Sequence, residues 1–253
     1  MSYLEVSAVN VSFGGLRALN DCNFTIEAGK ITCLVGPNGA GKTTIFNVIT
    51  GFLRADTGAV SFRGEKLAGL SPQEIVDLGI ARSFQNLRLF SQLTALDNVL
   101  IGIRGQFGET IFGAVLRPFH TVKTQRAERA RAMEILEHVG LAAKAGTFVR
   151  NLSYGEQKLL TVARLLATGA DLLLLDEPAS GMSADALEEI IALLKRLKGE
   201  NKTLLVVEHN TRVVQRIADT VLFLHQGHLM AEGSVEEITS NPALTEIYFG
   251  GTI

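Results

Sequence analysis

A glycine-rich segment at residues 36–43 has the composition and spacing of a phosphate-binding loop. Its sequence, Gly-Pro-Asn-Gly-Ala-Gly-Lys-Thr, fits the pattern G-x-x-x-x-G-K-[ST]. Glycines let successive backbone N–H groups surround an anion, and a following helix adds partial positive charge at its N-terminus. Lys42 can then reach the β- and γ-phosphates of a nucleotide, and the Thr43 hydroxyl can ligate Mg²⁺. The residues expected to hold the nucleotide here are Gly36, Asn38, Gly39, Ala40, Gly41, Lys42, Thr43 and Thr44.

Two acidic residues, Asp176 and Glu177, directly follow the apolar run at 172–175. A buried strand there would bring both carboxylates to the C-terminal edge of a parallel sheet, where α/β proteins bind ligands. Asp176 would hold Mg²⁺ through water, and Glu177 would polarise an attacking water molecule. Alone, this string could be a strand that ends in a solvated acidic turn. Beside the phosphate-binding loop, it predicts a Mg²⁺-dependent nucleoside-triphosphate site.

Short strands dominate the first part of the chain and lead to the loop. Residues 3–35 alternate apolar and polar types in runs rich in Val, Phe, Ile and Thr, and glycines at 14–15 and 29 interrupt them. The run at 31–35 enters the glycine-rich loop, and a helix is predicted from about 42 to 49. This strand–loop–helix order is the context that a phosphate-binding loop requires.

Helical spacing replaces the strand signals from about 86 to 166, where apolar residues recur every three to four positions. Strands and helices alternate again afterwards, and Ser234 and Glu237 form a predicted capping box at the start of the last helix. Further strands are expected at 57–63, 172–175, 203–207 and 220–224. The pattern predicts an α/β fold with a parallel-sheet core and a helical insertion.

A third string, Asn-Leu-Ser-Tyr-Gly-Glu-Gln at 151–157, separates the subclasses of such sites. Here the sequence resembles the ATP-binding cassette (ABC) ATPases, whose signature reads L-S-G-G-Q at the N-terminus of a helix. The leucine, Ser153 and Gly155 match this signature, whereas Tyr154 and Glu156 depart from it. The resemblance to the family therefore rests on this signature as well as on the phosphate-binding loop.

In the family, the signature serine, the second glycine and the helix N-terminus contact the γ-phosphate. The resemblance implies that Ser153 and Gly155 keep these functions. The amphipathic helix is expected to open near Gln157, and Glu156 would then place a negative charge near phosphate. Tyr154 removes the backbone freedom that a glycine would have. We therefore expect a working signature with altered details.

Other landmarks of the family occur in the expected order. Gln85 follows an expected strand at 80–84 and matches the glutamine that senses Mg²⁺ and the membrane partner. His209 matches the switch histidine that contacts the γ-phosphate. Phe13 lies where an aromatic residue stacks on adenine, although an aromatic residue at a strand end often belongs to the core. The block at 180–183 ends in Ser183, where the family usually has an acid.

The resemblance also implies how the site works. It is split between two chains, so that the phosphate-binding loop of one chain faces the signature residues of another, and the molecules it requires are ATP and Mg²⁺. The implied catalytic residues are Glu177, His209, Lys42 and Gln85. The implied Mg²⁺ ligands are Thr43, Gln85 and Asp176.

The resemblance covers essentially the whole chain and implies one ABC ATPase domain, residues 1–253. We expect a RecA-like P-loop core at about 1–85 and 167–253, with an N-terminal antiparallel β subdomain. A helical subdomain is expected as an insertion at about 86–166. This organisation agrees with the order of elements predicted from periodicity.

A finer resemblance lies at 81–90, Ala-Arg-Ser-Phe-Gln-Asn-Leu-Arg-Leu-Phe, which is similar to the corresponding segment of the branched-chain amino-acid importer ATPases. The chain length, an extra stretch at about 104–125 and the ending at 246–250 are similar to the larger of the two ATPases in those systems. The implied activity is ATP hydrolysis that powers a permease through closure and opening of a cassette dimer.

The implied partners are integral-membrane permease subunits, a second ABC ATPase in a hetero- or homodimer and, indirectly, a solute-binding protein. The expected location is the cytoplasmic face of the inner membrane, reached through the permease. Two alternatives stay open: a soluble ABC ATPase that organises a protein assembly, and an importer subunit for another solute such as urea or amides. The ATPase does not touch the solute, so its sequence reports the substrate only by kinship.

Composition restricts the remaining function classes. The 253 residues carry 24 Lys and Arg against 26 Asp and Glu, without the basic surplus that a dedicated nucleic-acid binder shows. Two cysteines cannot form a disulfide framework, and no signal peptide or membrane-spanning run is predicted. The basic, aromatic stretch at 104–126 fits a flap packed on the helical subdomain, or a segment that touches lipid headgroups or a membrane protein. We favour the flap.

Overall fold

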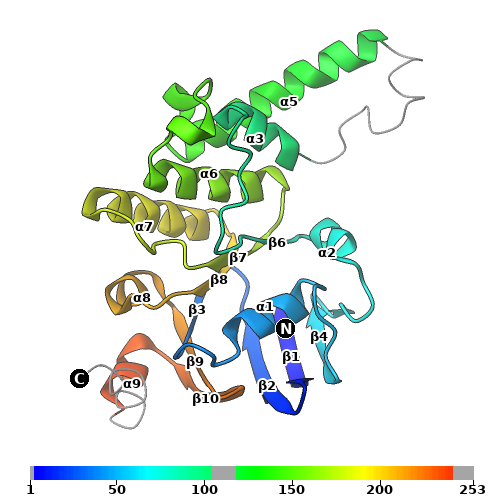
Figure 1. The fold of residues 1–253 in the computed structure, drawn as a ribbon, viewed down its shortest axis with the longest axis vertical. Coiled ribbons are helices and arrows are strands. Elements are labelled where there is room, and N and C mark those ends of the chain that lie inside the picture. The colour runs from blue at the N-terminus through cyan, green and yellow to red at the C-terminus, as the bar shows by residue number, and fades with distance from the viewer. Residues whose placement is uncertain (1–2, 104–117, 242–253) are drawn as a thin grey trace. The chain divides into compact units, whose positions relative to one another are not determined.

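The computed structural model describes residues 3–103 and 118–241, with side chains from 125 onward in the second range (Figure 1). Residues 104–117 of the predicted stretch at 104–126, and the chain ending at 246–250, lie outside the described residues. The chain forms two compact units. The core unit comprises Met1–Arg82, Asp171–Ser180 and Glu189–Ile253, and the helical unit comprises the remaining segments, Ser83–Ala170 and Gly181–Glu188.

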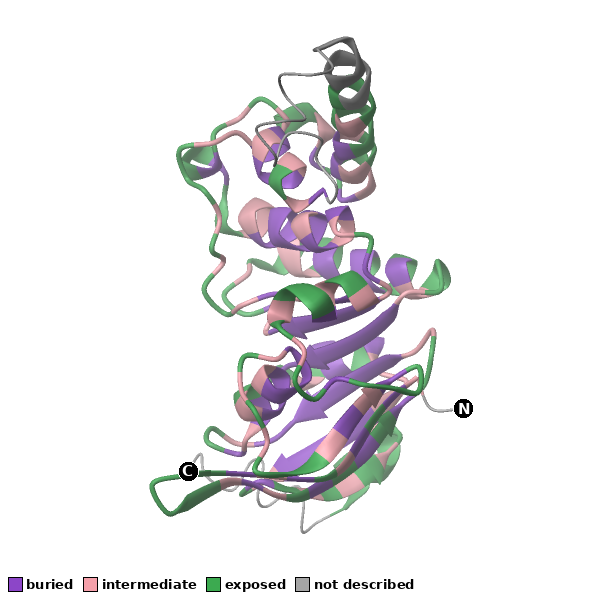
Figure 2. Cartoon of the chain, turned by 90° about the vertical axis from the view of Figure 1, so that its right-hand side faces the viewer, coloured by how far each residue is buried: buried purple, intermediate pink, exposed green. Residues whose placement is uncertain are grey.

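A six-stranded sheet forms the centre of the core unit, in the order β10-β9-β3-β8-β7-β6. Five strands run parallel, and the edge strand β10 pairs antiparallel with β9. Every residue of β3, β7 and β8 is buried, which is typical of central parallel strands (Figure 2). The strands are β3 (Ile31–Val35), β6 (Ile80–Arg82), β7 (Leu172–Asp176), β8 (Thr203–Val207), β9 (Thr220–His225) and β10 (His228–Gly233).

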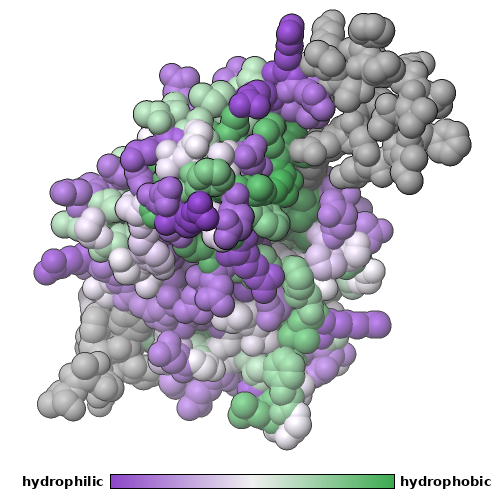
Figure 3. Space-filling model, turned by 45° about the horizontal axis from the view of Figure 1, so that its top comes forward, coloured by the Kyte–Doolittle hydropathy of each residue, from purple (hydrophilic) through white to green (hydrophobic). Residues whose placement is uncertain are grey.

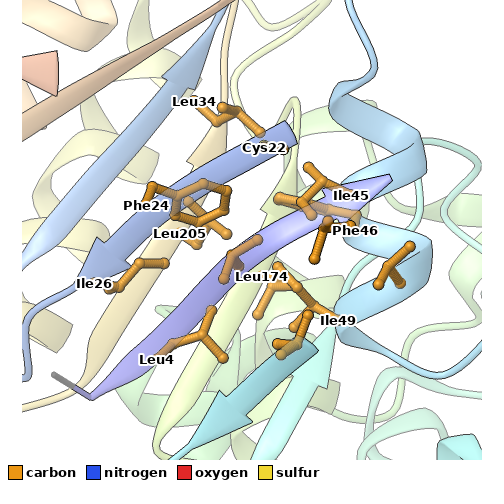
Figure 4. Close-up of a cluster of buried hydrophobic side chains, with 14 of the residues drawn as sticks. Leu4, Cys22, Phe24, Ile26, Leu34, Ile45, Phe46, Ile49, Leu174 and Leu205 are labelled. Carbon is orange, nitrogen blue, oxygen red and sulfur yellow. The ribbon is translucent and has the colours of Figure 1, made fainter. Parts of the chain in front are cut away.

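A second, antiparallel sheet has the order β2-β1-β4-β5. Its strands are β1 (Leu4–Phe13), β2 (Leu16–Ile26), β4 (Thr57–Phe62) and β5 (Glu65–Lys66). Alternate residues of β2 and β4 enter a hydrophobic core shared with the parallel sheet and helix α1 (Lys42–Ile49) (Figure 4). This core contains Leu4, Phe24, Ile26, Leu34, Ile45, Phe46, Ile49, Leu174 and Leu205. The α/β fold predicted from the sequence is confirmed.

The other helices that lie wholly in the core unit are short: α2 (Pro72–Leu78), α8 (Thr211–Ile217) and α9 (Val235–Ser240). The longer α7 (Ala184–Gly199) begins in the helical unit and continues in the core unit. The predicted capping box of the last helix is present, because the Ser234 hydroxyl accepts from the Glu237 N–H and the Glu237 carboxylate accepts from the Ser234 N–H. The predicted strand at 80–84 is shorter than expected and ends at Arg82.

The helical unit is built on α3 (Ala95–Gly102), α5 (Pro118–His138) and α6 (Tyr154–Ala167). Gly102 allows α3 to approach α6 closely, since a Cβ there would lie 2.8 Å from the Arg164 carbonyl oxygen. Asn98 is fully buried, and its side chain accepts from the Phe90 N–H and donates to the Phe90 carbonyl, which ties the loop before α3 to that helix. Figure 3 shows hydrophilic residues over much of one face, with patches of hydrophobic residues between them. Among the described residues, no helix combines the length and the hydropathy that crossing a bilayer requires.

Candidate nucleotide-binding site

The glycine-rich loop connects β3 to α1, the position that its spacing predicted. Gly36 has φ +148°, and a Cβ there would lie 2.0 Å from the Leu224 carbonyl oxygen. Gly41, the N-cap of α1, has φ +107°, and a Cβ there would lie 2.5 Å from the Ala18 carbonyl oxygen. Glycine is therefore required at both positions for the loop to pass so close to β9 and β2. The loop carries backbone N–H groups to a helix N-terminus, the arrangement that binds phosphate.

Lys42 is the first residue of α1, and its side chain folds back over the loop. Its ammonium donates to the carbonyl oxygens of Gly36 at 2.7 Å and Pro37 at 2.8 Å. Burial lowers the pKa of Lys42, and the negative charges of Glu177 and Asp176 act in the opposite direction. The ammonium and the two predicted acidic residues therefore lie within one electrostatic neighbourhood. A phosphate at this loop would give the ammonium an anionic acceptor.

The end of β7 holds the two predicted carboxylates in different backbone conformations. Asp176 is the last residue of the strand and is 8% exposed, whereas Glu177 follows in a left-handed conformation with φ +50°. Such a conformation is uncommon for a residue with a Cβ and is found at turns and functional sites. The Glu177 N–H donates to the Val207 carbonyl at 2.9 Å, which fixes the turn against β8.

His209 and Glu177 come together at this edge of the sheet. The distance from His209 Nε2 to Glu177 Oε1 is 2.8 Å, so the Nε2–H tautomer donates to the carboxylate. Glu177 was predicted from its place after a strand and His209 from the resemblance to the family, but their mutual contact was not predicted. A carboxylate that can accept a proton and an imidazole that orients it are suited to activating water.

Glu208, which no sequence motif singled out, anchors the loops that carry this pair. Its buried carboxylate accepts from the N–H groups of Ala179 at 2.9 Å, His209 at 3.2 Å and Asn210 at 3.5 Å. Burial raises the pKa of Glu208 and the charge of Glu177 adds to the rise, while the three backbone N–H groups act against it. The available signal was an acid directly after an apolar strand, in the same position as Glu177 after β7.

Arg82 was also missed by sequence reasoning. It ends β6 within the core unit, and its guanidinium lies 3.4 Å from Asp176 Oδ2. The signal was a charged residue inside a run expected to be a buried strand, a placement that is rare unless the charge is paired.

The signature segment begins helix α6 of the helical unit. The helix starts at Tyr154, so the expectation that it opens near Gln157 was wrong. The reason is a capping box: the Ser153 hydroxyl accepts from the Glu156 N–H at 3.2 Å, and the Glu156 carboxylate accepts from the Ser153 N–H at 2.7 Å. Gly155 lies so close to the first turn of α7 that a Cβ there would be 2.8 Å from the Ala186 Cβ.

Glu156 has closer partners than the sequence suggested. Its other carboxylate oxygen, Oε1, lies 3.6 Å from the Lys144 ammonium. Partial burial tends to raise the pKa of Glu156, but the hydrogen bonds from Ser153 and the charge of Lys144 outweigh it and lower the pKa. Glu156 therefore carries the negative charge that the sequence predicted, and the Lys144 ammonium lies beside it.

Tyr154, the other departure from the signature, packs on Gly181. Gly181 has φ +73°, and a Cβ there would meet the ring at 3.2 Å. The Lys158 ammonium lies 5.5 Å from the centre of the same ring. The tyrosine thus connects the start of α6 to the segment that ends in Ser183.

The remaining predicted residues divide between the two units. Phe13, at the end of β1, is 49% exposed, so its ring is not part of the core and is available to a ligand. The core unit brings together the loop, Asp176, Glu177 and His209, whereas Gln85 belongs with the signature residues to the helical unit. The structure defines the geometry within each unit.

The oxygen ligands in the core unit fit the preference of Mg²⁺. This ion is usually held by one or two protein oxygens together with substrate phosphates. The Thr43 hydroxyl, exposed in the first turn of α1, and the Asp176 carboxylate are groups of this kind. The described residues contain no group of three or more His, Cys, Asp or Glu side chains placed to hold a metal ion.

A phosphate-binding loop before α1, a carboxylate pair at the end of β7, a histidine after β8 and a capped signature helix together define an ATP-binding cassette. The family model described as ABC transporter matches residues 19–180, and the chain belongs to this family. The recognition made from the sequence is thus confirmed.

Relatives extend the similarity over nearly the whole chain. The chain is 36% identical over 248 residues to the high-affinity branched-chain amino acid transport ATP-binding protein LivG of Escherichia coli (strain K12), covering 98% of this chain and 97% of the relative. It is 37% identical over 252 residues to the protein of the same description, BraF, of Pseudomonas aeruginosa, with the same coverage of both chains.

Solved structures support the fold. A nucleotide-free ATP-binding cassette from an ABC transporter superposes with a TM-score of 0.86 at 31% identity, covering 99% of this chain and 100% of that one. A dimeric cassette in a post-hydrolysis state, bound to ADP and phosphate, gives a TM-score of 0.75 at 27% identity and covers 92% of this chain and 98% of that one.

Proposed function

We propose that the chain is the ATP-hydrolysing, energy-coupling subunit of a membrane importer for branched-chain or related amino acids. The observation that carries this proposal is the near-complete coverage at 36–37% identity of two proteins described as branched-chain amino acid transport ATP-binding proteins. The chain also has the features that this activity needs: the phosphate-binding loop, the Glu177–His209 pair and the capped signature helix. The similarity and the site therefore support the same activity.

In this proposal the loop residues hold the phosphates, and Lys42 contacts the β- and γ-phosphates. Thr43 and Asp176, with Gln85, would hold Mg²⁺, which would neutralise charge on the phosphates. Glu177 accepts the proton of the attacking water, and the 2.8 Å contact with His209 orients its carboxylate. His209 also stabilises the charge that develops on the transferred phosphoryl group.

A complete site would need two cassettes. Ser153 and Gly155 of one chain would face the phosphate-binding loop of another, with Phe13 stacked on the adenine. ATP then favours the closed pair because it contacts both sides, and loss of the γ-phosphate removes contacts across the interface. The dimeric cassette bound to ADP and phosphate supports such an arrangement. One chain of each pair would be this protein, and the other a second copy or a second ABC ATPase.

The proposed partners are two permease subunits and, through them, a solute-binding protein. The chain would bind the permease at the cytoplasmic face of the inner membrane, as a peripheral subunit. Opening and closing of the cassette pair would then drive the permease. No nucleic-acid partner is proposed, since 26 acidic residues outnumber 24 basic ones.

A tagged pull-down from gently solubilised native membranes tests the function, with co-purifying proteins identified by mass spectrometry. We expect two permease subunits and a second, shorter ABC ATPase, absent from a control with the tag on an unrelated protein. The co-purified solute-binding protein would name the solute, and a binding protein for urea or amides would overturn the amino-acid assignment. Soluble partners only, with the chain absent from membranes, would overturn the importer function.

A further inference from the structure

Arg82 is a buried arginine that joins two elements of the candidate site. Its side chain is 5% exposed at the end of β6. One terminal nitrogen, Nη1, donates to Asn47 Oδ1 on α1 at 2.5 Å, and Nη2 lies 3.4 Å from Asp176 Oδ2 at the end of β7. The guanidinium carbon lies 5.2 Å from the ring centre of Phe46, which is labelled in Figure 4.

Burial of a guanidinium is unfavourable unless its N–H groups and its charge have partners. Arg82 meets this condition at its two terminal nitrogens, which contact an amide oxygen and a carboxylate, and its plane faces an aromatic ring, all in the core unit. The buried Nε makes no hydrogen bond to the described residues. The planar fork of arginine suits such a bridge, because its two terminal nitrogens point in fixed directions. A simple ammonium in its place would keep the charge and lose this geometry.

The carboxylate that Arg82 meets is the predicted Mg²⁺ ligand. The Asp176 side chain is 9% exposed, so rotation about its terminal bond is constrained by its neighbours. The contact of Arg82 with Oδ2 from one side restrains the carboxylate and therefore the direction of Oδ1. Groups that orient a metal ligand in this way commonly change metal affinity when they are removed.

We propose that Arg82 is a positioning residue, which holds the Asp176 carboxylate in the orientation that the Mg²⁺–nucleotide complex requires. This inference rests on the proposed ATP-binding function. Arg82 acts through its contact with Asp176. It also connects Asp176 to α1, the helix that begins at the phosphate-binding loop, so that both parts of the site share one support.

The chain offers a matched control at the other end of β7. Arg63 lies 2.7 Å from Asp171 Oδ2, and its guanidinium carbon lies 4.7 Å from the Phe62 ring centre. Asp171 directly precedes the strand that Asp176 ends. Arg63→Met therefore removes an arginine–carboxylate pair over an aromatic ring at the start of the same strand, away from the proposed metal ligand at its end.

The test is equilibrium binding of a fluorescent ATP analogue, methylanthraniloyl-ATP, to the purified full chain while free Mg²⁺ is varied. We expect Arg82→Met to raise the Mg²⁺ concentration at half-maximal effect about tenfold. Binding measured without Mg²⁺ should stay at the wild-type level, and Arg63→Met should match the wild type throughout. Arg82→Lys, which keeps the charge without the fork, should fall between wild type and Arg82→Met.

Circular dichroism and thermal unfolding establish whether each variant is folded. If Arg82→Met does not fold, Arg82→Lys carries the test alone, and a wild-type Mg²⁺ dependence in that variant would overturn the inference. A wild-type dependence in folded Arg82→Met would overturn it as well. If the wild-type chain binds no ATP analogue under any condition, the proposed function itself fails, and this result is distinct from either outcome.

Discussion

At the scale of single residues, Glu177 combines a strained backbone with a defined hydrogen-bond partner. Its left-handed conformation and its contact with His209 direct one carboxylate oxygen. Glu177→Gln keeps the size of the side chain and an oxygen that can accept from His209, but it cannot take a proton from water. We expect ATP binding to persist while turnover falls by about 10²–10⁴-fold. Phosphate release measured beside ATP affinity checks this, and turnover near the wild-type rate would exclude Glu177 as the base.

The Lys144–Glu156 pair makes a second prediction at this scale. Glu156→Gln keeps an oxygen that can accept from the Ser153 N–H, but it removes the negative charge that would face a phosphate. In the wild-type background, Lys144→Met should reduce ATPase activity by about 1.4- to five-fold, because exposed pairs contribute about 0.2–1 kcal/mol. In a Glu156→Gln background the same substitution should have little effect, and salt should diminish the difference. Equal effects of Lys144→Met in both backgrounds would contradict this interpretation.

Residues in local motifs could be predicted, and residues that act across the fold could not. Lys42 and Asp176 are found from spacing because a loop and a strand end confine them to one neighbourhood. Arg82 lies 94 residues from Asp176 in the chain, so its pairing depends on β6 and β7 being neighbours in the sheet. No local pattern contains that information.

At the scale of elements, the strands that form the core were predictable, and the edges were less so. β3 and β8 have the predicted bounds because each is a run of five buried residues ended by loop residues. β10 alternates between exposed and half-buried positions and is held by its ladder with β9, so its sequence has no clear strand signal. α2 and α8 have seven residues each, too few to show helical periodicity.

The start of α6 shows a competition between two interpretations of one string. Ser153 and Glu156 fit the S-x-x-E capping box as well as the family signature. The same rule correctly identified the last helix from Ser234 and Glu237. Applied at Ser153, it would have placed the helix start at Tyr154 and given Glu156 a structural role.

Glu208 provides a pH prediction at the scale of elements, because it joins the end of β8 to the loop after β7. Its folded-state pKa is raised by burial above the ordinary value of 4.5, so the folded protein holds this proton more tightly than the unfolded chain. The stability contributed by Glu208 is therefore present at low pH and is lost as the pH rises through the raised pKa.

Glu208→Gln removes this titration. The difference in unfolding free energy between Glu208→Gln and the wild type should increase as the pH is raised from about 5 to 8. A pH-independent contribution from the new amide does not alter this slope. Urea unfolding at several pH values measures the difference between the two proteins, which cancels the contributions of the other carboxylates. A difference that does not change with pH would show that Glu208 keeps an ordinary pKa.

At the scale of the whole molecule, the order of elements was enough to predict two regions with different secondary structure. The α/β segments come together from three parts of the chain, and the mostly helical segments form the other unit. The sequence signal for this division is the change from strand alternation to helical spacing near residue 86, which is close to Ser83, the first residue of the helical unit. The resemblance to the family supplied the assignment of one nucleotide site to residues from both units.

The assignment of one nucleotide site to residues of two chains predicts the mass of a cassette that binds ATP without hydrolysing it. If Ser153 and Gly155 of one chain complete the phosphate site of another, a cassette that binds ATP without hydrolysing it should accumulate in the closed pair. Glu177→Gln with ATP and Mg²⁺ should therefore double the mass of this 27.2 kDa chain in light scattering, alone or mixed with the second ATPase recovered from membranes. Two controls should give the mass of a single cassette. ADP in place of ATP has no γ-phosphate, and the double variant Glu177→Gln/Lys42→Ala lacks the ammonium that would contact it. An ATP-independent mass with both partners present would contradict the shared site, since the γ-phosphate would then make no contact across the interface.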